Sequence, residues 1–227
     1  MAAAQAAAST RRLLSRADAL PESCLHLPSV YILNGTIYKN GKFLGQGAFS
    51  YKANCDGLVL WQDGFGYLYR ENAPVGKPVS HYDVSWYGAT IIWVDSYGSL
   101  NRNDEELGRV QEYLFVKYTG DVVWKNGYGY LYRNRQEFGR SQNHAVASRT
   151  ADVAWVNSYG VLYRNDQELG RAQSWAISDR TGTVGWLDSF HNLYKNNVQI
   201  GSSVDQFTMR EDGKIIWKDR SGHEHSA

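Results

Sequence analysis

Residues 153–171 read VAWVNSYGVLYRNDQELGR, and close variants of this stretch recur along most of the chain. Tryptophans mark the period, with successive spacings of 32, 31, 31, 31 and 31 residues: Trp61, Trp93, Trp124, Trp155, Trp186 and Trp217. Asp or Asn follows each Trp by two residues, and after the first five an aromatic residue follows by four, Leu by seven and Gly by fifteen. A fixed period of this length predicts a repeat architecture.

Each period reads as short strands separated by turns. In the fourth period we predict strands at DVVWKN (121–126), YLYRN (130–134), FGRSQ (138–142) and HAVAS (144–148). No segment of the period shows helical periodicity, which excludes an αβ solenoid, and a β-trefoil would have three repeats. Radial closure protects the edges of many short sheets, so the pattern favours a β-propeller.

The repeat count follows from extending the frame to the N-terminus. Val30 stands where a Trp is expected, and from Val30 to Trp217 the chain covers six periods. We therefore predict an all-β fold, a six-bladed propeller of four-stranded blades over residues 30–222. The strand around Trp217 is expected to pair with the N-terminal strand GTIYKN (35–40) and so close the ring. Residues 223–227 are expected to form a disordered tail.

The hairpin WVNSYGVLYRN (155–165) followed by QELGR (167–171) resembles the blade units of short-repeat β-propellers, such as tachylectin-like and tectonin-like proteins. The resemblance covers roughly residues 30 to 220 as an architecture and identifies no single family. It implies a fold shared by many lectins and many protein-interaction scaffolds. It assigns no functional residue.

The N-terminal residues 1–29 differ from the repeats because they are rich in Ala and Arg. They read as a helix or tail, and their composition also fits an organellar transit peptide. Cys24 and Cys55 are 31 residues apart, and the sequence leaves open whether they form a disulfide or stay free thiols. A disulfide would favour an oxidising compartment, so a secreted or periplasmic location is slightly favoured.

The repeated Trp, the base nine residues later and the Asp or Asn two residues later allow two interpretations. If Trp lies across the hairpin from the base, as Trp155 from Arg164, the set could pack adjacent blades together. Alternatively the same residues could form repeated pockets in which a sugar stacks on aromatic rings and bonds to polar groups. The candidate ligand-binding residues are Trp93, Arg102, Trp124, Arg133, Trp155, Arg164, Trp186, Lys195, Tyr97, Tyr128 and Tyr159.

The net charge of the chain and its sequence motifs limit the classes of function that we expect. A net charge of +1 gives no field that would attract nucleic acid, and no apolar run is long enough to insert into a membrane. No catalytic, cofactor or metal motif occurs, so we expect no enzyme, cofactor or metal site. The leading prediction is a non-catalytic lectin-like protein that binds a glycan through equivalent inter-blade sites, and the alternative is a propeller that binds a protein partner.

Overall fold

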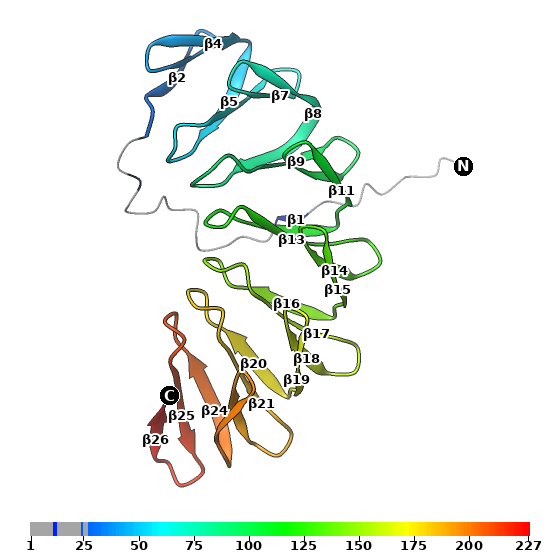
Figure 1. Cartoon of the computed structure of the whole chain (residues 1–227), viewed down its shortest axis with the longest axis vertical. Coiled ribbons are helices and arrows are strands. Elements are labelled where there is room, and N and C mark those ends of the chain that lie inside the picture. Colours follow the sequence, from blue (N-terminus) through cyan, green and yellow to red (C-terminus); the bar gives the residue numbers. More distant parts are fainter. Residues whose placement is uncertain (1–10, 13–23, 25–26) are drawn as a thin grey trace, which may run out of the picture. The chain divides into compact units, whose positions relative to one another are not determined.

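The computed structural model describes residues 11–12, 24 and 27–227, and the chain divides into two compact units, Met1–Gly127 and Tyr128–Ala227. The strands of the first unit are β1 (Arg11–Arg12), β2 (Val30–Leu33), β3 (Thr36–Lys39), β4 (Lys42–Gln46), β5 (Ala48–Ala53), β6 (Val59–Asp63), β7 (Tyr67–Arg70), β8 (Ala73–Val84), β9 (Ile91–Asp95), β10 (Ser99–Arg102), β11 (Glu105–Arg109), β12 (Glu112–Val116) and β13 (Asp121–Lys125) (Figure 1). The strands of the second unit are β14 (Tyr130–Arg133), β15 (Gln136–Arg140), β16 (Asn143–Val146), β17 (Val153–Val156), β18 (Val161–Arg164), β19 (Gln167–Arg171), β20 (Ser174–Ile177), β21 (Val184–Leu187), β22 (Leu193–Lys195), β23 (Val198–Gly201), β24 (Val204–Met209), β25 (Ile215–Asp219) and β26 (Glu224–Ser226). The predicted all-β class is confirmed.

The repeats form small antiparallel sheets. In the first unit β2–β4 form one sheet, and β5–β11 form another in which the long strand β8 pairs with both β7 and β9. In the second unit β16–β19 and β20–β23 are four-stranded sheets, and β24–β26 form a three-stranded sheet. Apart from the two-residue β1, which pairs with β12 in parallel, every strand pair with a described register is antiparallel.

The conserved spacing of the repeat places one Leu of each period in the core. The Leu seven residues after Trp has no solvent exposure in any of the five repeats that carry it: Leu68, Leu100, Leu131, Leu162 and Leu193. In the sheet β16–β19, Leu162 packs with Ala154 and with Val184 and Trp186 of the following sheet. Each core is therefore shared between neighbouring sheets, as is typical of repeat proteins.

The predicted closing strand pair is wrong. β25, which carries Trp217, pairs with β24 on one side and β26 on the other, while β3 pairs with β2 and β4. Because a strand has only two hydrogen-bonding edges, β25 and β3 have none left for each other. The first and last repeats thus each have their own sheet, and the closed ring stays a prediction.

Within the described residues, seven strands rather than six occupy the position of the Trp-bearing strand. We call them the tryptophan strands, and they are β2, β6, β9, β13, β17, β21 and β25. In β2 the residue at the Trp position is Tyr31, not Val30, since Tyr31 lies opposite Tyr38 as Trp155 lies opposite Tyr163. The shift arises because Asn34 and Gly35, both with positive φ, make a two-residue turn that is shorter than the turns of later repeats.

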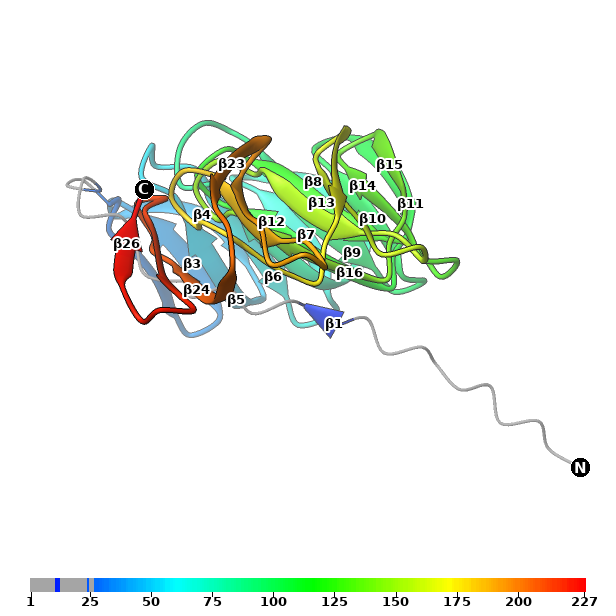
Figure 2. The ribbon, with the colours of Figure 1, turned by 90° about the horizontal axis from the view of Figure 1, so that it is seen from below.

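The two ends of the chain also differ from expectation. Residues 224–226 form β26 instead of a disordered tail (Figure 2). The ring of His225 stacks on Trp217 with centroids 5.5 Å apart. His225 Nε2 lies 3.0 Å from Asp219 Oδ2. In residues 1–29, Arg11 and Arg12 form β1, and most of the predicted helix or tail lies outside the described residues. No helix among the described residues has the length and hydropathy needed to cross a membrane.

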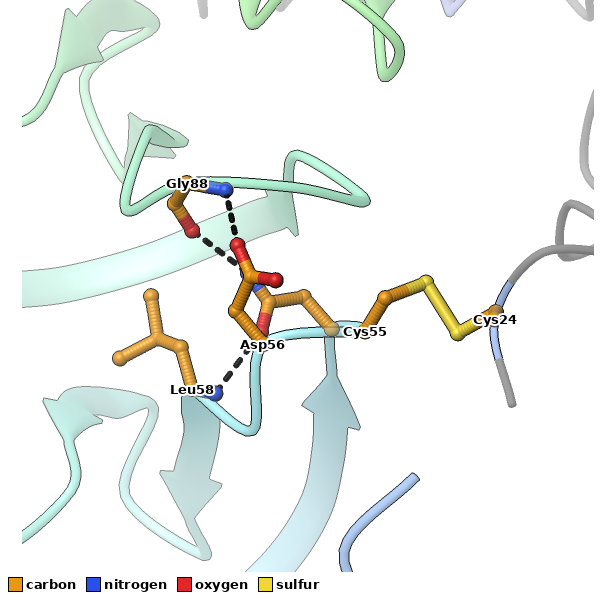
Figure 3. The surroundings of a disulfide bond; sticks show 6 residues. Cys24, Cys55, Asp56, Leu58 and Gly88 are labelled. Atoms are coloured by element: carbon orange, nitrogen blue, oxygen red, sulfur yellow. Dashed lines mark hydrogen bonds between the residues drawn. A yellow bond between two sulfur atoms is a disulfide. The ribbon is translucent and has the colours of Figure 1, made fainter. Parts of the chain in front are cut away.

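Cys24 and Cys55 form a disulfide, which answers the question that the sequence left open. Cys55 lies in the turn between β5 and β6, and its N–H donates to Trp86 O over 2.8 Å. Beside it the side chain of Asn54 bonds Gly88 O and Leu58 N, and Asp56 accepts from Gly88 N (Figure 3). The bridge therefore ends in a turn that is held firmly against the next one, and the loop that it closes contains the whole sheet β2–β4.

Candidate functional site

In the repeats of Trp61, Trp93, Trp155 and Trp186 the indole lies across its hairpin from an aromatic ring or amide and not from the base. The register pairs Trp155 with Tyr163 and places Arg164 opposite Ala154. The rings of Trp155 and Tyr163 stack with centroids 4.4 Å apart and planes 14° from parallel. Because successive residues of a strand face opposite sides of the sheet, the predicted contact between Trp155 and Arg164 is wrong. The same register pairs Trp93 with Asn101 and Trp186 with Tyr194.

The other face of the indole is covered by a glycine of the preceding sheet. A Cβ added to Gly139 would lie 2.9 Å from Trp155, and one added to Gly170 would lie 2.7 Å from Trp186. Both glycines sit at a β-bulge with φ near +140°, a conformation that residues with side chains rarely adopt. Gly is thus required fifteen residues after Trp for two reasons. The backbone conformation disfavours a side chain there, and the indole of the next sheet leaves no room for a Cβ.

The four tryptophans predicted to bind ligand are therefore inside the packing between strands and sheets. Their exposed fractions are 8% for Trp93, 5% for Trp124, 4% for Trp155 and 5% for Trp186. A sugar that stacks on an indole needs an open ring face. The structure accordingly supports the packing interpretation of the tryptophans.

Sequence reasoning missed a residue that holds the hairpin together in the repeats of Trp93, Trp155 and Trp186, the Asn ten residues after Trp. The N–H of Asn165 donates to Val153 O over 2.7 Å, and its Oδ1 accepts from Val153 N–H over 3.0 Å. Its carbonyl accepts from Trp155 Nε1 over 2.7 Å. Asn196 repeats all three bonds with Val184 and Trp186.

A signal for this residue was present in the sequence. Asn follows the base in four consecutive repeats, at Asn103, Asn134, Asn165 and Asn196, and all four have φ between 52° and 54°. Asn is one of the few residues that adopt this left-handed conformation readily. A base followed by a recurrent Asn, just before a turn, therefore pointed to a backbone role.

Two of the predicted ligand-binding bases contact the following repeat instead. Arg102 Nε donates to Gly120 O over 3.1 Å. Arg133 Nη1 lies 3.4 Å from Ala151 O and 3.4 Å from Asn165 Oδ1. Both arginines are half-buried and bridge the end of one hairpin to the turn that precedes the next tryptophan strand.

Arg164 binds a carboxylate of its own repeat, and Lys195 is half-buried at the equivalent position. Arg164 Nη2 lies 3.2 Å from Asp152 Oδ2, while Asn165 Nδ2 donates to Asp152 Oδ1 over 2.7 Å. Burial would raise the pKa of Asp152, but hydrogen bonds from Asn165, Thr150 and Arg164 and the charge of Arg164 outweigh it, and the pKa is lowered. These groups satisfy one another, which leaves little capacity for a polar ligand.

The Asp or Asn two residues after Trp caps the turn of the hairpin. Asn157 Oδ1 accepts from Tyr159 N–H over 2.9 Å and from Val161 N–H over 3.1 Å. Asp188 Oδ1 holds the equivalent turn through Phe190 N–H. Such side-chain bonds to the backbone are typical of turns. The residue therefore fixes the backbone from which the aromatic residue at the tip projects.

The aromatic residues at these turns are the exposed part of the repeat. Their exposed fractions are 86% for Phe65, 71% for Tyr97, 79% for Tyr128, 77% for Tyr159 and 81% for Phe190. The predicted pocket combined the Trp and the Tyr of one repeat. The structure separates them, because the indole is buried in the packing and the tip ring projects into solvent.

In the part of the chain that the structure describes, no group of three or more His, Cys, Asp or Glu side chains is arranged so that it could hold a metal ion. The exposed rings at the hairpin turns are separate aromatic knobs, each on a turn with a defined backbone.

No protein-family model matches the chain, and no curated protein matches it. Among solved structures, one titled "Crystal Structure of Mitotic Checkpoint Complex" is 12% identical with a TM-score of 0.29, covering 100% of this chain and 96% of that one. The WD40 β-propeller domain of Doa1 is 10% identical with a TM-score of 0.30, covering 85% and 86%. The C-terminal WD40 domain of Sif2 is 12% identical with a TM-score of 0.31, covering 79% and 66%. At these values the likeness carries no inference about function.

Proposed function

We propose that this protein is a non-catalytic scaffold that binds a protein partner through the exposed aromatic residues at its hairpin turns. We call these residues the tip aromatics, and they are Phe65, Tyr97, Tyr128, Tyr159 and Phe190. The proposal rests on one observation: all five are more than 70% exposed, whereas the tryptophans of the same repeats are buried.

Repeated exposure of large aromatic side chains favours an interface. Tyr and Phe are enriched in protein–protein interfaces, where a few buried aromatic side chains supply most of the binding energy. Each tip aromatic has a rigid ring with few rotatable bonds, so its burial costs little conformational entropy. The first unit carries two of these residues and the second unit carries three, so each unit offers more than one anchor to a partner.

The turns are also ordered before any partner arrives. Asp63 Oδ1 accepts from both Phe65 N–H and Tyr67 N–H over 2.9 Å, and Asp95 Oδ1 binds Tyr97 N–H over 2.8 Å. A side chain that projects from an ordered turn loses less entropy on binding than one on a mobile loop. This preorganisation supports a binding role for the tips.

The experiment compares the wild-type protein with a variant in which all five tip aromatics are changed to Ser. Each protein is immobilised, exposed to proteins of the native source and cross-linked, and the captured proteins are identified by mass spectrometry. The proposal expects a protein captured by the wild type to fall by about tenfold or more with the variant, as the loss of several interface anchors implies.

A control variant changes exposed polar residues at the turns on the other side of the hairpins, Asp104, Arg135, Asp166 and Asn197, to Ser. It is expected to capture as the wild type does. Equal capture by the tip variant would contradict the proposal. A glycan array on which the wild type binds and the tip variant does not would instead favour a lectin whose sugars stack on the tips.

The Cys24–Cys55 disulfide supports a second part of the proposal, that the protein works in an oxidising compartment. Labelling with a thiol reagent before and after reduction, in protein isolated from its source, tests this point. Two thiols that react only after reduction are expected, and thiols that react at once would contradict it.

A further inference from the structure

The connectivity of each sheet places two repeat positions at the same edge, by which we mean the end of the sheet at which the hairpin turn with the tip aromatic lies. Tyr159 lies in the turn between β17 and β18, and Arg171 ends β19, whose register pairs Arg171 with Val161. The N–H of Ala172, the next residue, donates to Gly160 O over 3.1 Å. The tip aromatic and the Arg twelve residues later are therefore neighbours at one edge of the sheet.

The same arrangement occurs in three consecutive repeats, and each time a Gln follows the Arg by two residues. We call each set a tip triad, and the triads are Tyr97, Arg109 and Gln111; Tyr128, Arg140 and Gln142; and Tyr159, Arg171 and Gln173. All nine residues are exposed. In the second triad the Arg140 side chain also lies against the turn, since a Cβ on Gly129 would be 3.7 Å from it.

Within the described part of the chain, the three arginines of these edges are not paired with a carboxylate, although the turn of the first triad contains the carboxylate of Asp95, which caps the backbone. Among the described residues, Arg109, Arg140 and Arg171 form no ion pair. The turn of the third triad is capped by the neutral Asn157. The exposed Glu of each outer strand, such as Glu168 in β19, stands three residues before the Arg, about 10 Å away along an extended strand.

Two triads of the second unit follow one another in adjacent sheets. β17 packs on β15 through the contact of Trp155 with Gly139, and β21 packs on β19 through the same contact of Trp186 with Gly170. A contact that repeats imposes a geometry that repeats. Equivalent edges of successive sheets thus face the same side, so the second and third triads form a short row of Tyr and Arg.

We propose that the tip triads bind acidic segments of the partner protein, with Arg140 and Arg171 of the second unit pairing with the carboxylates of one segment and Arg109 of the first unit binding a carboxylate independently. This inference rests on the proposed function and adds the chemical class of the partner. Arg forms bidentate bonds with carboxylates, Gln and Tyr supply further hydrogen-bond donors, and the Tyr ring covers the apolar part of an adjacent side chain.

A polypeptide fits these edges better than other polyanions. The tip aromatics project as knobs, and knobs are received by pockets on a folded partner or by a peptide that wraps them, whereas sugars are usually held in concave sites. The chain as a whole carries a net charge of +1, which gives no long-range attraction for nucleic acid.

The test measures binding of fluorescein-labelled poly-L-glutamate by fluorescence anisotropy at several salt concentrations. A triple variant, R109Q/R140Q/R171Q, is expected to bind about tenfold or more weakly than the wild type and to show a smaller salt dependence. The triple Lys variant at the same positions keeps the charge and is expected to bind within about threefold of the wild type.

The matched control is R149Q/R180Q/R210Q, which removes the same charge from exposed arginines in the turns at the opposite edge. It is expected to bind as the wild type does, and circular dichroism verifies that all variants fold. Equal loss in the control, or no loss in the triad variant, would overturn the inference. So would binding of polygalacturonate in place of poly-L-glutamate.

The two proposals fail separately. If poly-L-glutamate does not bind but capture of a partner still depends on the tip aromatics, the protein-binding function stands and the acidic partner is wrong. If capture does not depend on the tip aromatics, the proposed function itself fails.

Discussion

Tyr31 in the first sheet and Trp155 in the sheet β16–β19 occupy the same register position, yet Tyr31 is 42% exposed and Trp155 only 4%. Both stack on a Tyr across the hairpin, Tyr31 on Tyr38 at 5.2 Å and Trp155 on Tyr163 at 4.4 Å. The difference is the second face, which Gly139 of the preceding sheet covers for Trp155. Burial at this position thus comes from the neighbouring sheet more than from the hairpin itself.

The sheet β2–β4 is held by other means. The disulfide closes a loop around it, and Tyr51 of β5 donates its hydroxyl to Val30 O over 2.8 Å. It also serves the next sheet as a platform, because Gly45 lies under the ring of Trp61. The comparison therefore sets a repeat stabilised by an inserted indole against one stabilised by a covalent bridge.

The largest expected effect on stability is the difference between substitutions at Trp155 and at Tyr31. Trp155→Ala should lower the free energy of unfolding by about 3–5 kcal/mol, since it leaves a cavity between two sheets. Tyr31→Ala should cost about 1 kcal/mol or less, because much of the ring is already in water. Urea denaturation followed by tryptophan fluorescence measures both, and similar losses for the two variants would break the comparison.

Removal of the disulfide should rank next. The paired variant C24S/C55S is expected to lose about 2–4 kcal/mol, because a loop of this length is no longer closed in the unfolded chain. Amide hydrogen exchange should accelerate in residues 30–46 and stay unchanged in residues 153–171. Equal acceleration in both segments would show that the bridge stabilises more than the first sheet.

Substitutions at two glycines distinguish the stability cost of backbone strain from the cost of overpacking. Gly170 and Gly76 have φ of +143° and +144°, but a Cβ on Gly170 meets Trp186 while one on Gly76 meets nothing within 4 Å. Gly76→Ala should therefore cost only the strain, and Gly170→Ala should cost about 1–3 kcal/mol more, from overpacking against the indole. Thermal denaturation of the two variants gives the difference, and equal losses would exclude a packing role for the Trp186 contact.

A smaller effect is expected from acid. Because the pKa of folded Asp152 lies below its ordinary value of 3.8, its contribution to stability is complete above that value and is lost as the pH falls through the lowered pKa. Asp152→Asn should cost about 1 kcal/mol at pH 7, in line with a few hydrogen bonds, and should flatten the pH dependence below pH 4. Urea midpoints at pH 7, 4 and 3 measure it, and an unchanged slope would contradict the assignment.

The smallest effect on stability is expected at the tips. Tyr159→Ser should change the free energy of unfolding by less than about 0.5 kcal/mol, because the ring is exposed and contributes little to the core. The same variant should weaken partner capture, which a residue with a purely structural role would not do. A loss of stability similar to that of Trp155→Ala would mean that the ring packs in a way that the structure does not show.

Much of the fold could be predicted from local patterns. The strands around Trp124 and Tyr132 lie where the repeat and its turn residues predicted them. The site was predicted less well. The register error of one residue exchanged Tyr163 for Arg164 as the neighbour of Trp155, because the sequence does not show how many residues a turn contains.

The end repeats were beyond sequence reasoning for a related reason. The repeat pattern predicts that Trp217 belongs to a blade shared with the N-terminus, whereas the short turn after Asp219 lets β26 fold back and pair with the free edge of β25. A strand near the chain end can pair with a local or a distant partner, and the local pattern is the same in both cases.

The sequence by itself determined the period, the all-β class and the turn residues, because each of these depends on residues close together in the chain. Only the tertiary structure decided that the indoles are packing elements, that Cys24 meets Cys55, and that Tyr and Arg share an edge. Whether a ring has an open face depends on the sheet that lies against it, and residues of two repeats, about 31 positions apart, have to meet before that is settled.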